Sequence, residues 1–163
     1  MRKKLCLILV TVWGMALLAG CGGETKNATP SSPQAEPETT HETDKKEQTT
    51  MKMNVQIGDQ TFTATLADTT AAQEFAQMLP MTITLDDYGG FEKVGSLGRS
   101  LTTSNSQTTT AAGDIVLYNG SNIVMFYGSN SWSYTRLGKI DNLTGWADAL
   151  GSNSVTAIFT LAN

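Results

Sequence analysis

The sequence has 163 residues, of which 40% are hydrophobic and 16% charged, and its formal net charge at pH 7 is −4. Residues 51–163 alone carry five basic and nine acidic side chains, so nucleic acid is not an expected partner. The same stretch has no His and no Cys, which excludes Ser–His and Cys–His catalytic pairs and metal sites built from those ligands.

The chain opens with a basic segment and then an apolar one. Residues 2–4 are Arg, Lys and Lys, and they precede an apolar run over residues 5–18. This order is typical of an export signal. The run has about 14 residues, whereas a helix needs roughly 20 to span a bilayer. We therefore expect a signal peptide over residues 1–20, removed after export, rather than a transmembrane anchor.

The next residues, Leu18-Ala19-Gly20-Cys21, resemble the lipobox of bacterial lipoproteins, in which a Cys follows the cleavage site. The resemblance implies that Cys21 carries a diacylglyceryl thioether and an acylated amine, with long-chain acyl groups such as palmitate. Two or more chains make a stable anchor. Gly22 replaces the Asp of an inner-membrane retention signal. We expect a lipoprotein on the extracytoplasmic face of the cell membrane, with membrane lipid as its partner through Cys21.

Residues 21–50 are expected to be the lipidated Cys and a disordered linker. Thr, Ser, Pro, Glu, Lys and Gln dominate this segment, which cannot bury enough apolar surface to fold. His41 lies there without another His or Cys beside it, so we expect no metal role for it. Cys6 leaves with the signal peptide, so the mature chain forms no internal disulfide. The folded domain is expected over residues 51–163.

The first half of this domain alternates mostly as strand. Apolar residues at every second position predict a hairpin over residues 51–57 and 61–66, with a turn at Gly58-Asp59. Thr70 and Gln73 resemble a capping box at the start of a short helix that ends before Pro80. Period two returns over residues 81–85, and residues 86–98 are expected to be irregular.

The second half repeats this pattern. Strands are predicted over residues 115–118 and 123–127, joined by a type I′ turn at Asn119-Gly120. A further strand is expected over residues 132–137, then a short helix with Leu143, Trp146, Ala147 and Leu150 on one face and Gly151 as its C-cap, and a last strand over residues 155–161. Many short strands with two short helices indicate a mainly β domain, either an antiparallel barrel or a closed sandwich with end caps.

Four segments, in this order, resemble the bacterial cyclophilin-like domain family. They are LP at 79–80, DYGGFEK at 87–93, GDI at 113–115 and YTRLGKI at 134–140. The resemblance implies a closed, antiparallel, eight-stranded cyclophilin-like barrel with two short capping helices. Gly98 departs from the family, which tends to have Pro there, and this leaves the rigidity of the loop before Arg99 open. The family shares a fold, and membership does not bring an established activity with it.

An alternative is a divergent peptidyl-prolyl cis-trans isomerase. Similarity to true cyclophilins would imply an Arg that stabilises the twisted amide, beside a pocket of Phe, Met, Gln, Trp and His. The domain lacks His, and the Phe-His-Arg and Gln-Phe-Phe segments of those enzymes have no counterpart here. Arg99 and Arg136 are its only arginines, and surface ion pairs would explain both. We therefore assign no catalytic residue and favour a protein that is not an enzyme.

Carboxylate chemistry is the other route to activity. Asp86, Asp87, Glu92 and Asp114 could serve as acid and base groups or bind Ca²⁺. Their positions in expected turns and strand entries favour structural roles instead. We expect no metal and no cofactor. The chain has no flavin-binding motif, although the family resemblance suggests a flavodoxin-like protein as a partner.

The candidate ligand-binding residues are Tyr88, Glu92, Arg99, Trp132, Tyr134 and Arg136. Aromatic side chains with one polar end, in Gly- and Ser-rich segments near charged groups, are what a concave binding site uses. Core packing is the competing interpretation for the aromatic residues. The sequence as a whole predicts a membrane-anchored, non-catalytic module that binds a small ligand or a peptide.

Overall fold

The computed structural model describes residues 50–163, so the predicted signal peptide, Cys21 and almost all of the linker lie outside the described residues. The described part has nine strands and two helices. They are β1 (Lys52–Ile57), β2 (Gln60–Leu66), α1 (Thr70–Ala76), β3 (Met81–Tyr88), β4 (Glu92–Ser96), β5 (Ser106–Thr109), β6 (Asp114–Tyr118), β7 (Asn122–Phe126), β8 (Ser131–Ile140), α2 (Trp146–Leu150) and β9 (Val155–Leu161). Neither helix has the length and apolar character that crossing a bilayer requires.

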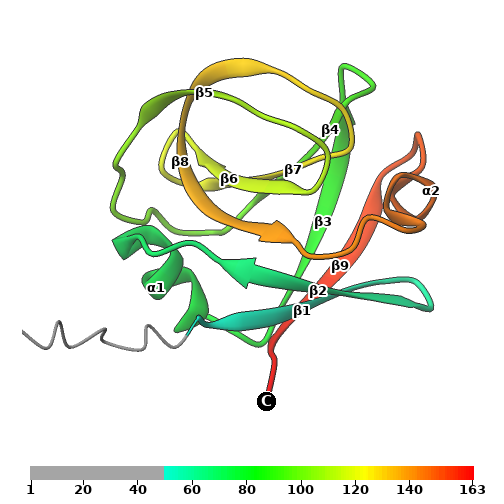
Figure 1. Cartoon of the computed structure of the whole chain (residues 1–163), viewed down its shortest axis with the longest axis horizontal. Helices are drawn as coiled ribbons and strands as arrows, with labels where there is room; N and C mark the ends of the chain where they lie inside the picture. The colour runs from blue at the N-terminus through cyan, green and yellow to red at the C-terminus, as the bar shows by residue number, and fades with distance from the viewer. Residues whose placement is uncertain (1–49) are drawn as a thin grey trace, which may run out of the picture. The chain divides into compact units, whose positions relative to one another are not determined.

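The strands form a closed antiparallel barrel (Figure 1). Eight of them follow one another in the order β2-β1-β9-β3-β4-β7-β6-β8, and β8 pairs again with β2 to close the ring. The short β5 pairs with the N-terminal part of β8, residues 131–134. This confirms the predicted mainly β fold, a closed eight-stranded barrel with two short helices.

The barrel interior is filled by the apolar residues that alternate along the strands. Met53, Val55 and Ile57 of β1 are buried, and so are the inward residues of β2. Two aromatic residues come from the helices, Phe75 from α1 and Trp146 from α2. Trp146 donates a hydrogen bond from Nε1 to the carbonyl oxygen of Phe126 at 2.8 Å, so the indole is buried with its polar group satisfied.

The structure corrects the predicted ends of both helices. Thr69, not Thr70, is the N-cap of α1, and its hydroxyl accepts a hydrogen bond from the Ala72 amide at 3.1 Å. The helix α2 begins only at Trp146, after Gly145, so Leu143 precedes it and is 43% exposed. Trp146 and Leu150 alone carry the buried side of α2, and Gly151 is the predicted C-cap.

The prediction of an irregular stretch over residues 86–98 is wrong. Strand β3 continues to Tyr88, and a turn at Gly89-Gly90 leads into β4, which pairs with β3 and with β7. The strand β5 was also not predicted. The turn at Asn119-Gly120 is confirmed: both residues have positive φ, 49° and 72°, and the Ser121 amide donates to the Tyr118 carbonyl at 3.2 Å.

Gly98 follows β4 with φ at 72°. The ring of a proline fixes φ near −65° and could not adopt this conformation. A proline at position 98 would therefore not fit this loop, whereas a glycine adopts the positive φ without strain.

Candidate functional site

The barrel carries a second apolar cluster on its outer surface. It consists of the buried residues Val116, Val124, Phe126 and Tyr134, with Phe91, Val94 and Tyr118 packed against them. Along β6 and β7 the cluster residues alternate with apolar residues that face the interior, such as Ile123 and Met125. This part of the barrel wall is apolar on both faces. A strand face outside the main core that still gathers apolar side chains is a candidate binding surface.

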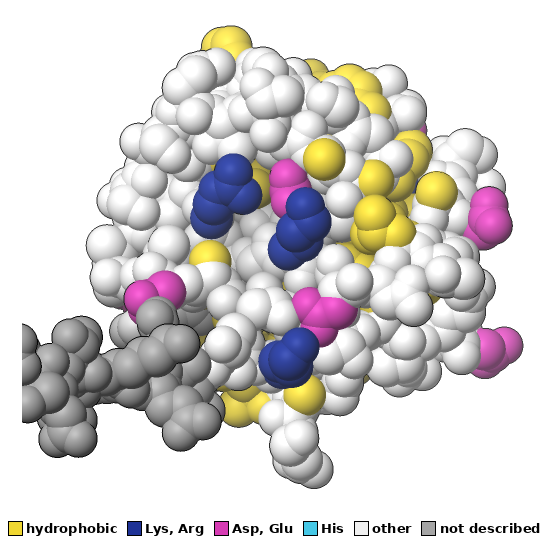
Figure 2. Space-filling view, viewed as in Figure 1, with side chains coloured by type: hydrophobic (Ala, Val, Ile, Leu, Met, Phe, Trp, Pro, Cys, Tyr) yellow, Lys and Arg dark blue, Asp and Glu magenta, His cyan; other side chains and the backbone are white. Residues whose placement is uncertain are grey.

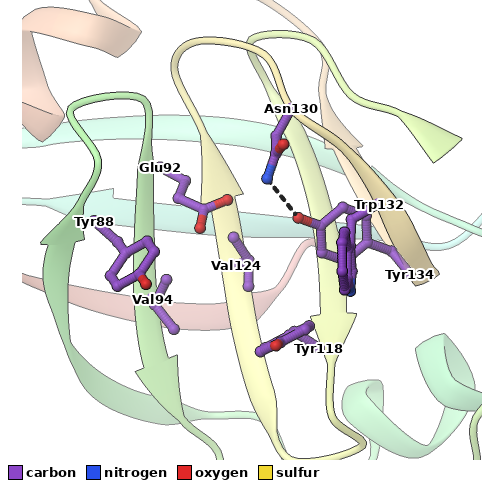
Figure 3. Close-up of a pocket in the computed structure, with 8 residues that line it drawn as sticks. All are labelled: Tyr88, Glu92, Val94, Tyr118, Val124, Asn130, Trp132 and Tyr134. Atoms are coloured by element: carbon purple, nitrogen blue, oxygen red, sulfur yellow. Dashed lines mark hydrogen bonds between the residues drawn. The ribbon is translucent and has the colours of Figure 1, made fainter. Parts of the chain in front are cut away.

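A pocket of about 450 Å³ lies over this cluster. Its lining residues come from β3, β4, β6, β7, β8 and the segment before β8: Tyr88, Glu92, Val94, Tyr118, Val124, Asn130, Trp132 and Tyr134. Figure 3 shows Val94 and Val124 on the sheet, with Tyr88 on one side and Trp132 and Tyr134 on the other. Its size falls within the roughly 300–1,000 Å³ of small-molecule sites.

Glu92 is the one charged residue among those that line the pocket. It is only 6% exposed, and its carboxylate points into the space between the aromatic side chains (Figure 3). Its Oε2 atom has no hydrogen-bond partner among the described residues. Burial raises the pKa of the Glu92 carboxyl above its ordinary value.

Tyr134 and Asn130 form the polar edge of the pocket. The Asn130 side-chain amide donates a hydrogen bond to the Tyr134 hydroxyl at 3.1 Å (Figure 3). Thr110 fixes Asn130 through its backbone, because the Asn130 amide donates to the Thr110 hydroxyl at 3.0 Å and the Asn130 carbonyl accepts from the Thr110 amide at 2.8 Å. Burial and the nearby Glu92 charge raise the pKa of Tyr134. These contacts hold the pocket edge in a defined geometry.

A buried ionic network lies on the other face of β4 from Glu92. Lys93, which follows Glu92 on β4, is fully buried, and its Nζ donates to Asp87 Oδ1 and to the Asn153 carbonyl, both at 2.7 Å. The Tyr127 hydroxyl also donates to Asp87, and Lys93 Nζ lies 5.5 Å from the Tyr127 ring centroid. The hydrogen bonds from Lys93 and Tyr127 hold the pKa of the Asp87 carboxyl below its ordinary value. Burial and Asp87 together raise the pKa of Tyr127 to about 12.

The structure brings together four of the six predicted ligand-binding residues. Tyr88, Glu92, Trp132 and Tyr134 line the pocket, whereas Arg99 and Arg136 do not. Arg99 is exposed in the loop after β4. Its positive charge adds to the hydrogen bonds from Thr102 in lowering the pKa of the Glu74 carboxyl on α1. Arg136 is on β8 beside a separate hollow next to β2.

The competing interpretation of the aromatic residues as core applies to only one of the three aromatic candidates. Tyr134 is 3% exposed and belongs to the outer cluster, but Tyr88 and Trp132 are 66% and 57% exposed. The sequence interpretation missed Val94, Tyr118, Val124 and Asn130. The apolar runs over residues 115–118 and 123–126 carried a signal for Tyr118 and Val124, because strands buried on both faces lack alternation.

The other predicted carboxylates have structural partners. Asp86 accepts a hydrogen bond from Ser154 at 2.7 Å, and Asp114 accepts one from the Ala111 amide at 2.9 Å and lies 3.3 Å from Lys139 Nζ. Over residues 50–163, no three His, Cys, Asp or Glu side chains gather where they could hold a metal ion. Figure 2 shows basic and acidic side chains mixed on one face of the molecule rather than a patch of one sign.

The comparisons with known proteins concern mainly the fold. The model of a family described as the cyclophilin-like family matches residues 55–161. The solution structure of the hypothetical protein AF2241 from Archaeoglobus fulgidus is similar, with a TM-score of 0.53 and 16% sequence identity over 69% of this chain and 95% of that chain. At this identity the likeness extends to the fold alone. No curated protein matches the chain.

Proposed function

The chain belongs to the cyclophilin-like family, and from this premise we propose that it is a lipid-anchored, extracytoplasmic protein whose barrel binds a small ligand in the aromatic pocket. The single observation that carries the binding role is the pocket of about 450 Å³ with a buried carboxylate among aromatic walls. The support for the anchor is the basic and apolar N-terminal segment followed by Leu18-Ala19-Gly20-Cys21. We propose membrane lipid, through Cys21, as the partner that fixes its location.

Binding is favoured over prolyl isomerisation by the composition of the pocket. An isomerase of the cyclophilin kind would need an Arg beside the bound amide, and neither Arg99 nor Arg136 is among the lining residues. The charge in the pocket is negative instead. A carboxylate cannot donate the cationic hydrogen bond with which an arginine would stabilise a twisted amide.

The anchor is tested by expressing the full chain in bacteria grown with radiolabelled palmitate. We expect label and membrane association in the wild type and loss of both in Cys21→Ala. Cys6→Ala is the matched control, since that residue would leave with the signal peptide, and it should behave as the wild type. Label retained by Cys21→Ala would contradict the proposed lipid site.

The pocket is tested on the purified lipoprotein in a non-ionic detergent, with Xaa-Pro tetrapeptides, indole, phenol and 2-phenylethanol as probes. Binding in the pocket should quench the fluorescence of the exposed Trp132. We expect Trp132→Ala to weaken binding, measured by calorimetry, and Arg99→Ala to leave it unchanged. Equal binding by the wild type and Trp132→Ala would locate the bound probe elsewhere. The same peptides should isomerise no faster with the protein than without it.

A further inference from the structure

We infer that the ligand of the aromatic pocket is an organic ammonium ion, a small molecule with a protonated primary or secondary amine on an apolar body. This inference rests on the binding function proposed above and specifies its ligand class. The feature behind it is the Glu92 carboxylate, which is 6% exposed and has an oxygen with no hydrogen-bond partner among residues 50–163. Buried charges are normally paired, because an unpaired one loses its hydration without compensation.

Neither the polar residue that follows Glu92 in the sequence nor the amide that lines the pocket supplies that partner. Lys93 is adjacent in sequence, but it faces the barrel interior, where its ammonium group is held by Asp87 and the Asn153 carbonyl. The Asn130 amide lies at the pocket edge and donates to Tyr134 rather than to Glu92. The protein thus provides an acceptor and a negative charge in the pocket, and the missing donor has to come from the ligand.

The aromatic walls of the pocket also favour a cationic ligand. Tyr88, Tyr118, Trp132 and Tyr134 surround the position toward which Glu92 points, from three sides of the view in Figure 3. The faces of Trp and Tyr rings attract ammonium groups through their quadrupoles. No basic side chain lines the pocket to oppose a positive ligand.

Two details narrow the class of amine. A quaternary ammonium has no N–H and could not satisfy Oε2 of Glu92, whereas a primary or secondary ammonium can donate to it. Val94 and Val124 on the pocket floor contact the remainder of the ligand, and they require that it be apolar.

The test compares 2-phenylethylamine, which is a cation at neutral pH, with 2-phenylethanol, which has the same body without the charge. Both are titrated calorimetrically into the full lipoprotein in a non-ionic detergent, as wild type, Glu92→Gln and Glu74→Gln. Glu74 is the matched control because it is a carboxylate on α1, outside the pocket, bound by Thr102. We expect the wild type and Glu74→Gln to bind the amine about tenfold more tightly than the alcohol, and Glu92→Gln to bind the two equally.

Two results would overturn the ammonium inference. One is equal affinity of the wild type for amine and alcohol, or no binding of the amine. The other is a preference for the amine that survives in Glu92→Gln. In either case the binding function stands as long as the alcohol or a peptide binds in a Trp132-dependent way, so the failure of the two proposals is distinguishable. Thermal unfolding of Glu92→Gln, which should be no less cooperative than that of the wild type, shows that the variant is folded.

Discussion

Glu92 is a residue whose charge the unliganded domain does not need. Because burial raises its pKa above the ordinary 4.5, the folded domain keeps the proton on Glu92 to a higher pH than the unfolded chain does. The contribution of Glu92 to stability is therefore greatest below pH 4.5 and is lost as the pH rises through the folded-state pKa.

The expected outcome is that Glu92→Gln raises the melting temperature by a few degrees at pH 7. The gain should disappear near pH 4, where the wild-type carboxyl is protonated in both states. Thermal unfolding followed by circular dichroism at the two pH values measures this. A melting temperature that falls at pH 7 would show that the carboxylate has a stabilising partner within the domain.

Tyr127 is the residue whose titration makes the stability of the domain depend on pH in the alkaline range. Burial and Asp87 raise its pKa from 10.0 to about 12, so the buried, hydrogen-bonded hydroxyl contributes stability fully below pH 10, and this contribution is lost between pH 10 and 12. We expect Tyr127→Phe to melt at a lower temperature than the wild type at pH 8, and the difference to shrink toward pH 12. A difference that stays constant up to pH 12 would contradict the role given to ionisation of the Tyr127 hydroxyl.

The strand β4 could not be predicted from the sequence, whereas the hairpin of β1 and β2 could. The hairpin of β1 and β2 was predictable because its inward residues are apolar and its outward residues polar. The inward positions of β4 are Lys93 and Gly95, which break that pattern. Lys93 is neutralised by Asp87, and a Cβ on Gly95 would come within 2.6 Å of Leu85. Both compensations depend on β3 and are invisible in the sequence of β4 itself.

The candidate site was predictable to the same limited extent. Tyr88, Glu92, Trp132 and Tyr134 could be grouped from composition, but nothing in the sequence indicates that Arg136, on the same strand as Trp132, lies beside β2 instead. The strand β8 spans ten residues, and its pairing with β6 shifts register at Ile115–Val116. One strand therefore contributes to two hollows, and only the pairing of the whole sheet separates them.

Gly138 is the position at which β8 meets β2 and the barrel closes. A Cβ there would lie 2.7 Å from the carbonyl oxygen of Thr65, and a backbone atom cannot move aside as a side chain can. Gly138→Ala should destabilise the domain by about 1–3 kcal/mol, measured by urea unfolding. Ser133→Ala, on the exposed part of β8, is the control and should leave the free energy of unfolding unchanged. If Gly138→Ala had the same free energy of unfolding as the wild type, β8 and β2 would tolerate a wider spacing at this position.

Across the whole domain, the two tryptophans differ in their role: Trp146 stabilises the core, and Trp132 lines the pocket. Trp146 is 1% exposed and stacks edge-on against Phe62, with ring centroids 5.0 Å apart. Trp146→Ala should cost about 3–5 kcal/mol, because it leaves a cavity and removes the Nε1 hydrogen bond to the Phe126 carbonyl. Trp132→Ala should change stability by less than about 0.5 kcal/mol, because its ring lies at the surface. Equal losses in the two variants, by chemical unfolding, would contradict this division.

The arrangement around β1 has a mechanical consequence. This strand lies between two antiparallel neighbours, with six residue pairs to β2 and five to β9. Hydrogen bonds in such ladders run perpendicular to the strands, so a force along β1 from its N-terminal side loads all of them together in shear. The pocket, in contrast, is built on strands that follow β9 around the ring. A pull on the chain before Lys52 would thus act first on the two ladders of β1, and no residue of β1 lines the pocket.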